Sequence, residues 1–346
     1  MRDAAPRVAA LGEYCTSLGG RPDRLLEALG RRVDVREYPV RGLAAALREG
    51  ARALGRDGCE LLHVFDPHLL PVALILKARY RVPVTASVDA ARWRRVPRWA
   101  SRVDQLFVAD LDRARSFIAA GSGVSFMHTP PVTHRMVADG RATAQFRRLL
   151  RGVGAGRLVV GLVWPVDREH VRWFRDAVLP LLYGEPLIML LGAPNPRDPR
   201  LLFGRLSSRT RIRARALTSA EIASAAPFLD AFVVPAPVRR VTSQHELLLA
   251  LTASGVPLVA GGAVISDVLA HEQNALMVEP GDAMGLASTL NKLLTLPAAQ
   301  RHYLGQDFAR HSIERWNGDE AAELYAERYA ALVGRPRIPV ELLRAA

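Results

Sequence analysis

Short apolar runs that alternate with helical segments constrain this chain more than any other feature of its sequence. The pattern predicts strands near residues 7–12, 33–38, 59–64, 83–88, 104–109 and 124–128, then near 158–163, 187–192, 211–214, 256–260 and 275–278. Strands and helices that alternate at this spacing form βαβ units, whose strands run parallel. The sequence therefore predicts an α/β protein with two doubly wound, Rossmann-like parallel sheets.

The length predicts two domains. At roughly 150 residues per domain, a chain of 346 residues divides into about two, each large enough for its own core. Five residues with three glycines, 152–156, form a natural hinge. We therefore expect one domain over residues 1–153 and a second over 154–315.

The net charge of +13 is concentrated in the first half of the chain. Residues 1–150 contain 25 Lys or Arg against 15 Asp or Glu, whereas residues 151–346 contain 22 against 19. Such asymmetry favours an anionic partner for the first half, such as a phosphorylated acceptor or a lipid surface. A general preference for arginine is the alternative explanation, since Lys77 and Lys292 are the only lysines.

One basic segment has an unusual composition. Arginine forks match phosphate oxygens and tryptophan favours a lipid headgroup boundary, so the segment predicts an acceptor-binding or membrane-binding site. The alternative is a solvated basic face above two packed indoles. No nucleic-acid-binding fold signature accompanies the segment, so nucleic acid is not an expected partner. The residues concerned are Arg92, Trp93, Arg94, Arg95, Arg98 and Trp99.

Other features exclude several classes of protein. No apolar run reaches 18 residues, so no membrane-spanning helix is expected. The N-terminus lacks a signal pattern, which favours a cytoplasmic protein. If residues 92–99 bind lipid, the protein would be peripheral at the inner membrane face. Cys15 and Cys59 are expected to be reduced, buried thiols. The histidines have no metal-ligand spacing and no phosphate-binding P-loop is present, so no metal or cofactor is expected.

Residues 242–283 contain the densest run of signals. Ser243 and Glu246 have capping-box spacing, which predicts a helix start ahead of four leucines between 247 and 251. Gly255 can end that helix, a strand follows at 256–260, and a second helix is expected at 265–272. A helix that starts beyond the carboxyl end of a parallel strand offers unpaired N–H groups to an anion.

Three motifs here resemble family 4 nucleotide-sugar glycosyltransferases of the GT-B fold. They are Gly255-Val256-Pro257, residues 274–278 (NALMV) and Pro280-Gly281-Asp282. The resemblance implies two Rossmann-like domains facing across a cleft, with a last helix, 316–346, that crosses back to the first domain. It implies a retaining enzyme that moves a sugar from a nucleotide-diphosphate donor to an acceptor.

The resemblance also implies donor-site residues. In the first half, Gly19 and Gly20 match a Gly-Gly loop beside the donor phosphates and the acceptor, and Asp89 occupies the place of a family histidine. Asp89 is a candidate catalytic base or acceptor-orienting group, with helix capping as the alternative. In the second half, Arg168 stands near the position of a family lysine, and helix capping is the alternative role for Glu246. The candidate donor-binding residues there are Arg168, Arg239, Thr242, Ser243, Gln244 and Glu246.

The chain also departs from the family at the donor site. Thr242 and Ala250 stand where similar enzymes carry two glutamates, and Leu162 stands where they carry an arginine. Arg168, or Arg239 with Arg240, could replace the lost charge. The alternatives are a solvent-facing helix start for Arg168 and solvated loop charges for Arg239 and Arg240. Two functions follow. The first is a glycosyltransferase that binds its donor through other residues than the family glutamates and arginine. The second is a catalytically degenerate GT-B protein that acts as a binding scaffold.

Overall fold

The computed structural model describes residues 5–12, 23–88, 101–108, 125–133, 136–153, 156–163, 168–192, 210–213, 217–234, 244–261 and 268–334. Within these ranges, no helix combines the length and the apolar character that crossing a bilayer requires.

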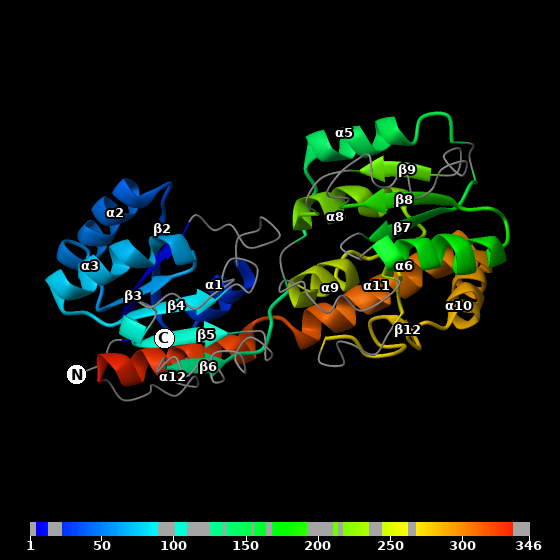
Figure 1. Cartoon of the computed structure of the whole chain (residues 1–346). Coiled ribbons are helices and arrows are strands. Elements are labelled where there is room, and N and C mark those ends of the chain that lie inside the picture. The colour runs from blue at the N-terminus through cyan, green and yellow to red at the C-terminus, as the bar shows by residue number, and fades with distance from the viewer. Residues whose placement is uncertain are drawn as a thin grey trace. The chain divides into compact units, whose positions relative to one another are not determined.

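A six-stranded sheet occupies the first half of the chain, with the order β2-β1-β3-β4-β5-β6 and all neighbours parallel (Figure 1). The central strands are buried, as expected for parallel strands covered on both faces. The strands are β1 (Arg7–Gly12), β2 (Asp34–Pro39), β3 (Leu61–Val64), β4 (Val84–Val88), β5 (Gln105–Val108) and β6 (Phe126–His128).

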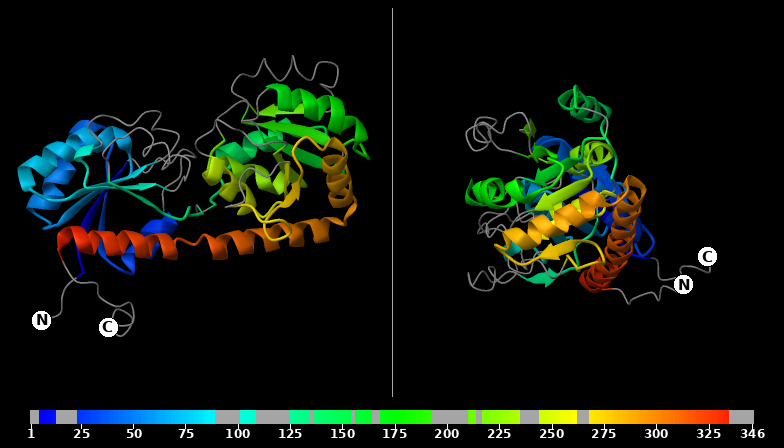
Figure 2. Two further views of the ribbon diagram at one scale, coloured as in Figure 1. Left: turned by 60° about the horizontal axis from the view of Figure 1, so that its bottom comes forward. Right: turned by 90° about the vertical axis from the view of Figure 1, so that its right-hand side faces the viewer.

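Helices cover both faces of this first sheet. One face packs against α2 (Leu43–Gly55), the short η1 (Pro67–Leu69) and α3 (Leu70–Tyr80). The other face packs against α1 (Asp23–Gly30) and α12 (Asp319–Val333), which lie side by side (Figure 2). The C-terminal helix thus completes the core of the N-terminal sheet.

A second six-stranded parallel sheet has the order β12-β11-β10-β7-β8-β9 (Figure 1). Its two central strands, β7 and β10, are fully buried and apolar. The strands are β7 (Val159–Val163), β8 (Leu187–Leu191), β9 (Thr210–Arg213), β10 (Ala231–Val234), β11 (Leu258–Gly261) and β12 (Leu276–Val278). Both sheets agree with the predicted fold class.

Helices also build the core of this second sheet. One continuous helical segment, α6 (Arg168–Trp173), η3 (Phe174–Val178) and η4 (Leu179–Leu181), packs with α10 (Ala283–Thr295) against one face. Contacts also join α5 (Gly140–Leu149) to α8 (Ser219–Ala225), α8 to α9 (Gln244–Thr252), and α9 to α11 (Ala298–Arg315). The short η6 (Ala226–Phe228) follows α8 directly.

The chain divides into two compact units at a different point from the predicted hinge. Unit 1 contains Met1–His134 and Trp316–Ala346, and unit 2 contains Arg135–Arg315. The boundary lies before α5, rather than at 153–154, because α5 packs on α8 of unit 2. Asp139, which caps α5, also receives a hydrogen bond at its carbonyl oxygen from the Ser224 hydroxyl, 3.1 Å away.

The predicted helix at 265–272 is wrong over its described residues, 268–272. Residues 270–275 form turns instead, because the Asn274 side chain satisfies the backbone of the loop. Its Oδ1 accepts from the Ala270 amide at 2.8 Å, and its Nδ2 donates to the Val268 carbonyl oxygen at 2.8 Å. Asparagine favours such local loops over helix.

Candidate functional site

The strand order of each sheet marks a place for a ligand. Numbered from β7, the second sheet follows the order 6-5-4-1-2-3, which is the Rossmann order and reverses between β7 and β10. In the first sheet the order reverses between β1 and β3. Ligands of doubly wound sheets bind beyond the carboxyl ends of the strands at these points.

Two helices begin beyond the switch point of the second sheet. Strand β7 ends at Val163 and the next described element, α6, begins at Arg168. Strand β10 ends at Val234, and α9 begins at Gln244. The predicted donor residues Arg168, Gln244 and Glu246 are therefore placed by their backbone at these two helix starts. First-turn amides have no partner within their own helix, which favours an anion there.

The other donor-site predictions in this unit, Arg239, Thr242 and Ser243, lie outside the described residues. The helix that they precede is as predicted. Leu247, Leu248, Leu249 and Leu251 are buried, and Gly255 follows the helix with a left-handed φ of 80°. The capping-box prediction for Ser243 stays a prediction.

Position 162 belongs to the core. Leu162 is fully buried against the helix layer, in one cluster with Val171 and Phe174. Its neighbour Gly161 lies in the middle of β7, where a Cβ would meet Leu229 Cδ1 at 2.9 Å and Phe232 Cδ1 at 3.1 Å. An arginine at 162 would be enclosed by apolar side chains. The absence of a cation at this position therefore reflects core packing.

Ala250 also has a described environment. It lies on α9 and is fully buried. At this position, where similar enzymes carry a glutamate, the side chain has no access to solvent. A carboxylate there would need burial with a partner, which is costly.

In the first unit, most predicted site residues lie outside the described residues. This applies to Gly19 and Gly20, to Asp89, and to the basic segment with Arg92, Trp93, Arg94, Arg95, Arg98 and Trp99. Chain continuity still fixes where two of these segments start. Gly19 and Gly20 fall between β1 and α1, and Asp89 directly follows the last residue of β4, Val88. Both segments leave the carboxyl edge of the sheet.

The structure adds a buried polar network that the sequence did not reveal. His63 on β3 is enclosed, and its Nδ1 lies 2.8 Å from Thr85 Oγ1 on β4. Its Nε2 lies 3.0 Å from Ser87 Oγ, and Ser87 Oγ in turn lies 2.8 Å from Tyr325 Oη on α12. The network therefore joins two central strands to the C-terminal helix.

Aromatic rings enclose this histidine. The His63 ring lies 4.4 Å from Phe65 and 5.6 Å from Tyr325, measured between centroids, and Tyr325 stacks on Phe107 at 3.7 Å. Burial lowers the pKa of His63 to about 3 and raises the pKa values of Tyr325 and Tyr329. All three groups are therefore neutral near pH 7, as a dry polar network requires. Both tyrosines are core residues.

Comparison with solved structures defines the class of fold. A sucrose-phosphate synthase from Thermosynechococcus elongatus matches with a TM-score of 0.57 at 14% identity, over 95% of this chain and 99% of that one. A glycosyltransferase from Rickettsia africae matches with a TM-score of 0.60 at 8% identity, over 96% and 100%. HepE from Anabaena, in complex with UDP and glucose, matches with a TM-score of 0.59 at 14% identity, over 94% and 100%. The chain has the GT-B fold of two Rossmann-like domains.

The sequence comparison is narrower. Residues 156–296 match the family model described as glycosyl transferases group 1. The match lies wholly within unit 2, which contains the β7–β10 switch point. No curated protein matches the chain significantly. The chain is thus a GT-B protein whose second domain carries the sequence pattern of group 1 glycosyl transferases.

Proposed function

We propose that this protein transfers a sugar from a nucleotide-diphosphate donor to an acceptor, with retention of configuration. The observation that carries the proposal is the group 1 glycosyl transferase pattern over 156–296, which spans the switch point of a Rossmann-ordered sheet. HepE, which shares the fold, is described in complex with UDP and with UDP-glucose, which makes a uridine donor a natural first choice.

The proposed chemistry requires stabilisation of a leaving diphosphate. As the sugar–phosphate bond lengthens, negative charge grows on the diphosphate oxygens, and fixed donors or cations aimed at them lower the barrier. The amides of the first turn of α9, beginning at Gln244, are suited to this role. Arg168 at the start of α6 supplies a cation, and Arg239 and Ser243 are further candidates from the sequence. This mechanism needs no metal, so EDTA should leave the rate unchanged.

The acceptor is assigned to the first domain. Gly19 and Gly20 follow β1 and Asp89 follows β4, so both segments start from the ligand-binding edge of that sheet. The excess of arginine in residues 1–150 favours a phosphorylated or membrane-bound acceptor. We assign Asp89 the task of orienting, or accepting a proton from, the acceptor hydroxyl.

A catalytically degenerate scaffold is the second candidate, and Ala250 is the residue that favours it. Its fully buried methyl group stands where similar enzymes carry a glutamate. A chain without its donor carboxylates could keep the fold and lose the donor.

A thermal-shift panel with UDP-, GDP- and ADP-sugars separates the two functions. A ligand that binds the native state stabilises it by RT ln(1 + [L]/Kd), so a transferase gains a higher Tm with at least one donor at millimolar concentration. Arg168→Ala should then weaken this shift and lower kcat by about 10²-fold. Arg172→Ala, which removes an exposed arginine from the same helix, is the matched control. A panel without any shift would favour the scaffold.

A further inference from the structure

One side of the first unit combines exposed aliphatic side chains with exposed arginines. Helices α2 and α3 cover the same face of the first sheet, so their outer surfaces lie on the same side of the unit (Figure 1). Leu43 and Leu47 on α2 are 50% and 42% exposed, and Ile75 on α3 is 59% exposed. Large aliphatic side chains at this exposure, gathered on neighbouring elements, are typical of an interaction surface.

The three aliphatic residues lie around a close helix–helix contact. A Cβ on Gly50 of α2 would meet Leu76 Cδ1 of α3 at 2.4 Å, so the Leu76 side chain packs directly against the backbone of α2 at this glycine. Leu47 lies one turn before Gly50, and Ile75 immediately precedes Leu76. The aliphatic patch is therefore built on a rigid, closely packed helix pair.

The exposed charges on this helix pair have one sign. Residues 41–81 are all described, and every charged residue among them that is classed as exposed is an arginine. The segment contains seven Lys or Arg against four Asp or Glu. The exposed arginines are Arg41, Arg48, Arg52, Arg56, Arg79 and Arg81.

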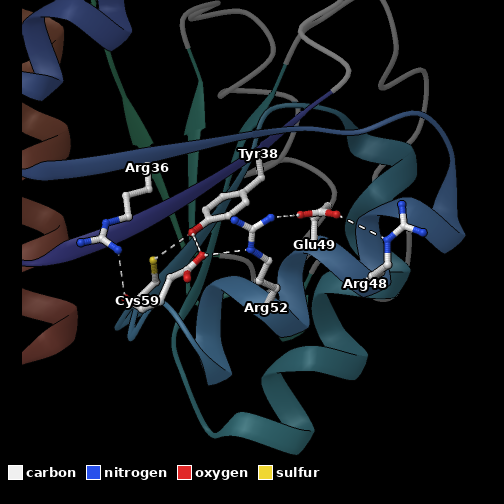
Figure 3. Close-up of polar contacts among 7 residues, drawn as sticks. Arg36, Tyr38, Arg48, Glu49, Arg52 and Cys59 are labelled. Carbon is white, nitrogen blue, oxygen red and sulfur yellow. Dashed lines mark hydrogen bonds and ion pairs between the residues drawn. The ribbon is translucent and has the colours of Figure 1, made fainter.

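The acidic residues of the segment are buried or bonded to neighbouring groups, and Figure 3 shows Glu49 between two of the arginines. The Glu49 carboxylate accepts from Arg48 and Arg52, each at 3.4 Å, while those arginine side chains stay 77% and 56% exposed. Asp57 accepts from the Tyr38 hydroxyl at 2.7 Å and has a side chain only 19% exposed. Asp66 is buried. Glu60 is half-buried and accepts from the Arg7 amide at 3.1 Å. No Asp or Glu of residues 41–81 is therefore exposed, whereas six arginines are.

We propose that this α2–α3 face docks on an anionic lipid bilayer. Aliphatic side chains enter the headgroup–acyl boundary, and arginines beside them bind lipid phosphates. Proteins that bind single-stranded nucleic acid stack its bases on aromatic side chains, whereas the exposed large apolar residues here are aliphatic. A second copy of the same face would place arginines against arginines.

The position of the face gives the docking a consequence. In a βαβ unit each helix starts at the carboxyl edge of the sheet, and Leu43 and Leu47 lie in the first two turns of α2. The aliphatic patch therefore adjoins the edge where doubly wound sheets hold ligands. Docking would bring that edge to the membrane surface, within reach of a lipid-linked acceptor. The inference does not depend on donor binding.

Co-sedimentation with vesicles tests the proposal on the full-length protein. The probes are phosphatidylcholine vesicles with and without about 30% phosphatidylglycerol, at low and high salt. We expect binding to the anionic vesicles alone, weakened by salt. Leu43→Gln/Leu47→Gln and Arg41→Gln/Arg79→Gln should each weaken it by about tenfold or more. Glutamine keeps the helix propensity close to that of leucine and arginine.

Matched controls come from unit 2. Met284→Gln/Tyr303→Gln changes exposed apolar residues, and Arg147→Gln/Arg148→Gln changes exposed arginines, so both should bind like the parent. Circular dichroism melts would establish that each variant folds. The proposal is overturned if the parent ignores anionic vesicles, or if the α2–α3 variants and the controls bind equally. It is also overturned if only Arg94→Ala/Arg95→Ala abolishes binding, or if the α2–α3 variants weaken binding of a single-stranded oligonucleotide and leave vesicle binding unchanged.

Discussion

His63 is the residue with the largest predicted effect on pH dependence. A histidine ordinarily has a pKa of about 6.5, whereas burial lowers the pKa of His63 to about 3. Between these values the unfolded chain binds a proton that the native state does not, so stability falls as the pH falls through this window. The slope from this group is about 1.4 kcal/mol per pH unit at most.

His63→Gln should remove this part of the pH dependence, because an amide can still bond Thr85 and Ser87 but does not titrate. Urea unfolding between pH 7 and pH 4 measures it. His302→Gln, an exposed change on α11, should keep the parental slope. An unchanged slope in His63→Gln would contradict the account of a buried neutral imidazole.

Arg301 offers a second prediction at this scale. Its Nη2 donates to Asp230 Oδ1 at 2.7 Å, and Asp230 Oδ2 accepts from the Val159 amide at 2.8 Å, so the pair ties α11 to the first residue of β7. The side chains are 11% and 23% exposed. Arg301→Met should lower the free energy of unfolding by about 3 kcal/mol, because it leaves the half-buried Asp230 carboxylate without its cation. Arg310→Met, whose pair with Asp307 is on the surface, should cost less than about 1 kcal/mol in the same chemical denaturation. An equal loss of stability in the two variants would contradict the larger contribution assigned to the Arg301–Asp230 pair.

At the scale of elements, the sequence predicted most strands because buried parallel strands are short, apolar and regularly spaced. It placed β8 within a residue of its observed bounds. The sequence wrongly predicted a helix over 268–272, because periodicity does not reveal that the Asn274 side chain holds these residues in a loop. It could not predict His63 as part of a network, because Tyr325 reaches the histidine only through tertiary folding. A histidine within the apolar strand 59–64 was the available signal.

The contact between α11 and the turn before β11 predicts that a Gly→Ala change within a helix destabilises the protein. Glycine within a helix usually costs about 1 kcal/mol relative to alanine, so Gly→Ala normally stabilises. In Gly305 a Cβ would meet the Gly255 carbonyl oxygen at 2.2 Å and Pro257 Cδ at 2.9 Å. Gly305→Ala should therefore lower the Tm, whereas Gly140→Ala at the open start of α5 should not. A higher Tm for Gly305→Ala would show that this contact is loose.

At the scale of the whole molecule, the two units differ in how they are built from the chain. Unit 2 is one continuous segment, whereas the core of unit 1 includes Ala321, Ala322, Tyr325 and Tyr329 from α12. The fragment 135–315 should fold alone, with cooperative melting by circular dichroism. The fragment 1–134 should not, and joining it to 316–346 by a flexible linker should restore a cooperative transition. Cooperative folding of 1–134 by itself would contradict this division.

The donor site itself was only partly predictable. The positions of Arg168 and Gln244 at two helix starts follow from the βαβ pattern. In such units every helix begins near the carboxyl ends of the parallel strands. Individual side-chain roles do not follow from that pattern, and the buried Leu162 shows why. The glycine motif aligns Leu162 with a family arginine, but in the structure this side chain is part of the apolar core.

Hydrogen exchange on the full-length protein tests whether a nucleotide-sugar binds at the β7–β10 switch point. The ligand is the nucleotide-sugar that gives the largest thermal shift, and the readout is amide protection by mass spectrometry. We expect protection in peptides covering 164–168 and 235–246, the segments that follow β7 and β10. Protection confined to other parts of the chain, or no protection with any donor at millimolar concentration, would contradict it.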